Sequence, residues 1–151
     1  MFAFDTTSIT DLLIQDTESA LERVSTQHTI SGFAYVFEVG QPEPCFHLAI
    51  DTGPPPSDPS TSEWTHPAGG FDGAQMSPEW DLLYALLSAY MDEDDELESR
   101  IHEVHALFRA VMRQIRAMWS ERLPGCIFTV NECNDSDEFI HATYVEINQP
   151  C

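Results

Sequence analysis

Glu98, His102 and His105 could together hold a metal ion, because spacings of four and three residues place side chains on one side of a helix. Imidazole and carboxylate groups are common ligands of zinc. The set lacks the His-Glu-x-x-His order of zinc hydrolases, and no matching ligand motif occurs elsewhere in the sequence. We therefore interpret the two histidines as solvated residues of an acidic helix, and we predict that the protein needs no metal or other cofactor.

The acidic run from Asp92 to Glu98 (DEDDELE) supplies carboxylates of the kind that bind calcium. An EF-hand loop requires glycine at its sixth position, but counting from Asp92 that position holds Leu97, so no calcium-binding loop is predicted. Cys45 and His47 would share one face of a strand, which core packing explains more simply than a catalytic dyad. Since glycine-rich phosphate-binding loops and the G-x-S-x-G motif are also missing, we predict that the protein is not an enzyme.

The chain is strongly acidic. Its 151 residues include 26 Asp and Glu against 6 basic residues, all of them arginine, and the formal net charge is −20. Such a charge destabilises a compact chain through self-repulsion and exceeds what solubility alone requires. We therefore predict a basic protein as the partner. Nucleic acids and anionic membranes carry the same sign of charge, so direct binding to either is not expected.

Length and apolar content predict a single domain over residues 1–151, since hydrophobic residues make up 42% of the chain. The N-terminal stretch MFAFDTTSITDLLIQD contains aspartates and no basic region, so it does not read as a signal peptide, and we expect a cytoplasmic protein. The four cysteines form no Cys-x-x-Cys pair. In a reducing compartment this indicates small buried side chains rather than disulfides.

Periodicity and turn residues predict an α+β domain. The predicted order is α-β-β-loop-α-α-β-β, with an antiparallel sheet of about four strands in two hairpins packed against three helices. The expected elements are a helix over 7–27, a hairpin from 33–39 and 45–50, an irregular Pro/Gly-rich loop over 51–76, a helix over 77–90, a long helix with an apolar stripe over 97–119, and a closing hairpin from 126–132 and 139–147.

Two acidic clusters and two aromatic residues are the candidate contacts with the partner. Charge runs are often solvated helix junctions, and aromatic residues in a loop often pin it to its own core, so both alternatives remain open. The predicted partner-binding residues are Asp92, Glu93, Asp94, Asp95 and Glu96 in the acidic run, Asp135, Asp137 and Glu138 at the tip of the closing hairpin, and Trp64 or Phe71 in the loop.

The sequence also resembles a class of small bacterial proteins. Its features are the aromatic strand FAYVFEV at 33–39, the tryptophans at 64 and 80 before a central helix, and the Gly-Cys-Ile-Phe strand at 125–128. In an acidic α+β chain without catalytic motifs, they resemble the immunity proteins of bacterial toxin systems, such as contact-dependent toxins and type VI secreted effectors.

The resemblance implies one-to-one neutralisation of a cognate toxin that acts in the cytoplasm. A nuclease is the expected toxin, because its phosphate-binding active site is basic and a carboxylate-rich surface can occupy it. The alternative is a DNA-mimic inhibitor of a restriction enzyme or another DNA-binding enzyme. That function requires carboxylates spaced along the surface like the phosphates of a duplex.

Salt is expected to stabilise the protein. The Debye length falls from about 30 Å in 0.01 M salt to about 8 Å near 0.15 M, so repulsion among the acids is screened to near neighbours. The melting temperature should therefore rise between these two concentrations in a calorimetric scan. A flat or falling melting temperature would mean that the acids are already paired within the fold.

Overall fold

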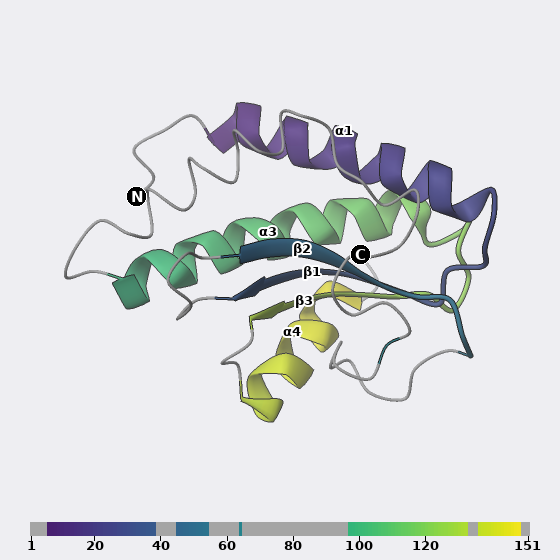
Figure 1. Ribbon diagram of the computed structural model, residues 1–151. Helices are drawn as coiled ribbons and strands as arrows, with labels where there is room; N and C mark the ends of the chain where they lie inside the picture. Colours follow the sequence, from purple (N-terminus) through teal and green to yellow (C-terminus); the bar gives the residue numbers. More distant parts are fainter. Residues whose placement is uncertain (1–5, 39–44, 55–63, 65–96, 133–135, 149–151) are drawn as a thin grey trace.

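The computed structural model describes residues 6–38, 45–54, 64, 97–132 and 136–148 (Figure 1). The predicted helix over 77–90, the acidic run and most of the loop over 51–76 lie outside these residues. The described elements, in chain order, are α1 (Thr6–Ser25), β1 (Gly32–Glu38), β2 (Cys45–Asp51), α3 (Leu97–Trp119), β3 (Ile127–Glu132) and α4 (Asp137–Asn148). The α+β class, the first helix, the first hairpin and the long helix are confirmed. None of the described helices is long and apolar enough to cross a membrane.

The described strands form a mixed sheet in the order β2-β1-β3. β1 and β2 pair antiparallel, with Gly32 opposite Asp51, as predicted for the first hairpin. β1 and β3 pair parallel, with Gly32 opposite Ile127. The prediction of an antiparallel sheet made of two hairpins is therefore wrong for β3. A parallel pair needs a crossover connection rather than a tight turn, and the chain between β2 and β3 includes α3.

The predicted closing strand over 139–147 is also wrong, because these residues belong to α4. Ser136 caps this helix: its hydroxyl Oγ accepts a hydrogen bond from the Phe139 amide at 3.2 Å, and its carbonyl accepts one from the Ile140 amide at 2.9 Å. Thr143 and Ile147, four residues apart, are both buried. The aromatic and β-branched residues that suggested a strand therefore follow the spacing of a helix, in which every third or fourth side chain faces the core.

The main core lies on one face of the sheet, and all three described helices contribute to it. Phe33 and Tyr35 alternate with Ala34 and Val36 along β1, so the two pairs face opposite sides of the sheet. α1 and α3 lie side by side and run in the same direction, with their C-terminal ends together (Figure 1). The main cluster includes Leu13 and Leu21 of α1, Val104, Phe108, Val111, Met112, Ile115 and Trp119 of α3, Phe128 and Val130 of β3, and Ile147 of α4.

One buried hydrogen bond in this core joins α1 to the sheet. The hydroxyl groups of Thr17 and Tyr35 are hydrogen-bonded to each other, and both residues are buried. Burial raises the pKa of Tyr35 far above its ordinary value, more than the hydrogen bond to Thr17 lowers it. Each hydroxyl thus has a partner where water is excluded, which avoids the cost of an unpaired buried polar group.

The side chain of Asn148, at the end of α4, forms a bridge to β3. Its amide Nδ2 donates to the Phe128 carbonyl at 2.7 Å, and its Oδ1 accepts from the Phe128 amide at 3.4 Å. Nδ2 also donates to the carbonyl of Tyr144 at 2.8 Å. Since Ile127 donates its amide to Ser31 next to β1, Phe128 points its amide and carbonyl away from β1. Asn148 therefore occupies part of the outer edge of β3.

Replacing Ser136 by alanine tests whether residues 137–148 form a helix. Loss of the capping hydroxyl should lower the free energy of unfolding by about 1 kcal/mol, while Ser136→Asp should retain most of it, because aspartate also caps helices. Urea denaturation of both variants measures the difference. Equal losses in the two variants would contradict the cap, since capping distinguishes the two side chains.

Candidate functional site

Trp64 lies buried on the second face of the sheet, with 4% of its surface exposed. It packs with Ala34, Val36 and Ala49. A Cβ on Gly32 would come within 3.0 Å and 3.1 Å of two atoms of the indole ring. Glycine at this position therefore makes room for the tryptophan. The Trp64 side chain therefore packs against the protein's own core, and its indole is buried in this conformation.

The remaining predicted partner-binding residues are not brought together within the described part of the chain. Asp137 and Glu138 open α4 instead of lying at the tip of a hairpin, and the side chain of Glu138 is exposed there. Phe71, Asp135 and the run Asp92–Glu96 lie outside the described residues. What the structure does show of this surface is therefore one exposed carboxylate in the first turn of a helix.

The interpretation of both histidines as solvated residues holds for His102 and is wrong for His105. His102 is exposed, whereas His105 is buried between α3 and α4. Nδ1 of His105 accepts a hydrogen bond from Nη1 of Arg109 at 2.6 Å, and the ring centres of His105 and Phe139 lie 5.0 Å apart. Arg109 Nε is 3.2 Å from a carboxylate oxygen of Glu146 without the alignment of a hydrogen bond. Among the described residues, no group of three His, Cys, Asp or Glu side chains could hold a metal ion.

Cys126 is a half-buried free thiol at the start of β3. Burial raises the pKa of this thiol to about 12, and the negative charge of Asp51 adds to the shift. The thiol is therefore protonated at neutral pH and is a poor nucleophile, because the thiolate is the reactive form. Cys45 and His47 lie in β2 as predicted, while their side chains are outside the described part.

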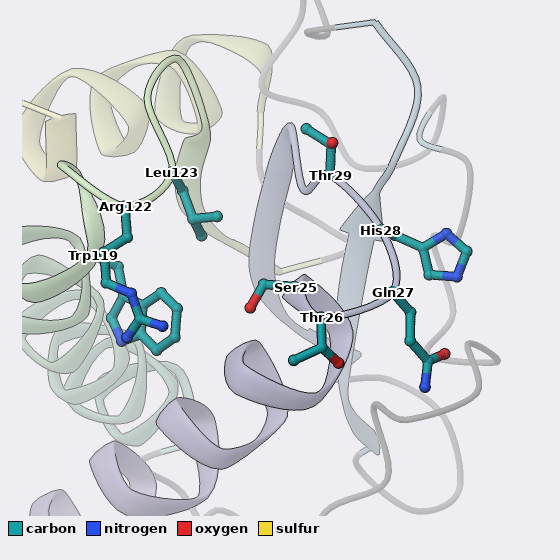
Figure 2. A pocket seen from close by; sticks show the side chains of 8 residues that line it. All are labelled: Ser25, Thr26, Gln27, His28, Thr29, Trp119, Arg122 and Leu123. Carbon is teal, nitrogen blue, oxygen red and sulfur yellow. The ribbon is translucent and has the colours of Figure 1, made fainter.

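A cavity of about 450 Å³ opens where the C-terminal ends of α1 and α3 meet (Figure 2). Hydroxyl, amide and guanidinium groups beside an aromatic ring are suited to recognising a polar or charged ligand. Sequence reasoning did not find this cavity, since its two halves are nearly a hundred residues apart. It is lined by Ser25, Thr26, Gln27, His28 and Thr29 after α1, and by Trp119, Arg122 and Leu123 at the end of α3.

Arg122 contacts two residues at this cavity. Its guanidinium carbon lies 3.9 Å from the centre of the Trp119 ring, within the range of a cation–π contact. Its Nη1 donates to Oε1 of Glu22 at 2.8 Å. This hydrogen bond lowers the pKa of Glu22 and raises that of Arg122. An aromatic ring and a carboxylate thus both contact one guanidinium at the junction of two helices.

The turn after α1 lines the other side of the cavity. Ser25 Oγ donates to the Glu22 carbonyl at 3.2 Å, and Thr26 Oγ1 donates to the Arg23 carbonyl at 2.8 Å. These side-chain bonds cap carbonyl groups in the last turn of the helix, and the Glu22 carbonyl also accepts a hydrogen bond from the Thr26 amide at 3.3 Å. The two hydroxyl oxygens retain lone pairs, so they can accept hydrogen bonds from a ligand.

Comparison of the chain with protein-family models, curated proteins and solved structures gave no match in any of the three.

Alkaline pH should destabilise the protein, in part through Cys126. The chain has no lysine, so only cysteine and tyrosine side chains titrate between about pH 9 and pH 12. The folded thiol keeps its proton up to about pH 12, against an ordinary value of 9.0, so its contribution to stability is complete below pH 9 and is lost as the pH rises to 12.

At pH 10 the wild type should lose about 1 kcal/mol more than Cys126→Ala, each relative to its own value at pH 8. Urea unfolding at the two pH values measures the difference. Both proteins retain Tyr35, so its titration cancels in the comparison. Identical losses in the two proteins would show that the thiol does not contribute.

Proposed function

We propose that this protein is an immunity protein that neutralises a basic toxin acting in the cytoplasm by binding it in a one-to-one complex. The observation that carries the proposal is its uncompensated charge, with 26 acidic residues against six arginines. Among the described residues, the thiol of Cys126 is protonated and Nδ1 of His105 is engaged by Arg109, which is consistent with a binding role.

The fold itself uses its arginines. Arg122 pairs with Glu22, and Arg109 pairs with Glu146. All six arginines lie in the described part of the chain, together with only half of the acidic residues. Even if every arginine neutralised one carboxylate, the net charge of −20 would remain. This surplus is therefore available to an external basic surface.

A nuclease is the toxin that this charge fits best. Its active site must attract phosphate groups, so it presents positive charge to solvent. A carboxylate-rich inhibitor is attracted to the same surface, and complementary charge accelerates association of proteins by orders of magnitude at low salt. We propose Asp92, Glu93, Asp94, Asp95 and Glu96 as the residues that supply this attraction, with Asp135, Asp137 and Glu138 as a second contact.

Neutralising the acidic run tests this function. Replacing Asp92, Glu93, Asp94, Asp95 and Glu96 by asparagine or glutamine should slow association with the toxin about tenfold or more in 0.01 M salt and flatten its salt dependence. Dissociation should change less, because peripheral charges act mainly on the association rate. Stopped-flow measurements with a candidate toxin, sought among the products of the neighbouring genes, give both rates.

A matched pair of double variants controls for net charge. Asp92→Asn with Asp94→Asn removes two charges from the run, and Asp11→Asn with Asp16→Asn removes two from α1. The first pair should slow association more than the second. Equal effects would assign the attraction to overall charge, and capture of the toxin at the wild-type rate by the five-residue variant would reject the acidic run as the contact.

A further inference from the structure

We propose that the cavity between the C-terminal ends of α1 and α3 receives an arginine side chain of the basic partner, and that Arg122 fills this site in the free protein. The inference rests on the proposed function, because it names one point at which the partner is held. It assigns a ligand class, a guanidinium group, to a site away from the acidic run.

The protein's own arginine shows what the site recognises. The guanidinium of Arg122 stacks on the Trp119 ring at 3.9 Å and donates to Glu22 at 2.8 Å. A flat cation is recognised in this way, by an aromatic face and a carboxylate. Trp119 is 2% exposed, and its ring belongs to the main core, so the platform is rigid.

The surroundings of the cavity also favour positive charge. α1 ends at Ser25 and α3 ends at Trp119, and the C-terminal ends of helices carry partial negative charge. The charge of Glu18 acts on Arg122 in the same sense as that of Glu22. The hydroxyl oxygens of Ser25 and Thr26 can accept hydrogen bonds on the other side. The two carboxylates and the two helix ends stabilise a cation in preference to an anion, and the hydroxyl oxygens can accept its hydrogen bonds.

Arg122 can give way to a partner's arginine. The side chains of Arg122 and Glu22 are each 53% exposed, and ion pairs with this exposure hold their partners weakly. The cavity volume of about 450 Å³ falls within the range of roughly 300–1,000 Å³ that is usual for small-ligand sites. A second guanidinium can therefore enter, take the Trp119 face and the Glu22 carboxylate, and displace Arg122 into solvent.

A small probe tests the site without the partner. N-acetyl-arginine amide is titrated into the protein, and binding is followed by the NMR signal of the Trp119 indole N–H, assigned with Trp119→Phe. Arg122→Ala should bind the probe at least fivefold more tightly than the wild type, because the internal competitor is gone. Adding Glu22→Gln should remove most of this gain. The uncharged isostere N-acetyl-citrulline amide should not bind either protein.

Arg113→Ala is the matched control, since it removes an exposed arginine from α3 and changes the net charge equally. It should bind the probe like the wild type. The site is rejected if Arg113→Ala gains as much as Arg122→Ala, or if the citrulline probe binds as well as the arginine probe. Because no toxin is present, this result does not depend on the rates that test the acidic run, so either proposal can fail alone.

Discussion

The apolar stripe of α3 is the feature on which the rest of the described structure depends. Phe108, Val111, Met112 and Ile115 are completely buried, and the helix contacts α1, β3 and α4. The helix therefore fixes the direction of α1 beside it, and with it the place where the ends of both helices meet. Truncating one of these side chains would leave a cavity shared by several elements, which is among the most costly changes in a protein core.

Local patterns in the sequence predict those helices and strands whose formation depends mainly on the spacing of neighbouring apolar residues. The stripe from Leu97 to Trp119 and the aromatic strand at 33–39 each have one periodicity, and both elements form as expected. Residues 139–147 have a mixture of aromatic and β-branched residues that fits either class. A single capping contact at Ser136 accompanies the helical outcome. Ser136 and Asp137 are equally typical of a turn and of a helix start, so composition alone could not separate the two.

Long-range features have no such local signal. The parallel pairing of β1 with β3 joins residues about ninety positions apart, and the cavity at Arg122 joins two turns at a similar distance. The position of Trp64 depends on the absence of a side chain at Gly32. In the sequence, Gly32 cannot be distinguished from any other glycine at the start of a strand. The acidic character of the chain was evident at once from composition, because net charge needs no fold. Which part of the surface binds a partner through that charge depends on the three-dimensional fold.

The contact between Asn148 and β3 has a consequence for how this protein behaves at high concentration. The outer edge of a sheet presents amide and carbonyl groups that can pair with a strand from another molecule, the first step toward fibrous aggregates. At Phe128 both backbone groups are already bonded to the side chain of Asn148. An incoming strand would have to break this amide bridge and move the end of α4. The last turn of the helix thus protects this edge from intermolecular β-pairing. This protection would matter most in concentrated salt, because salt weakens the repulsion between the acidic surfaces of two molecules.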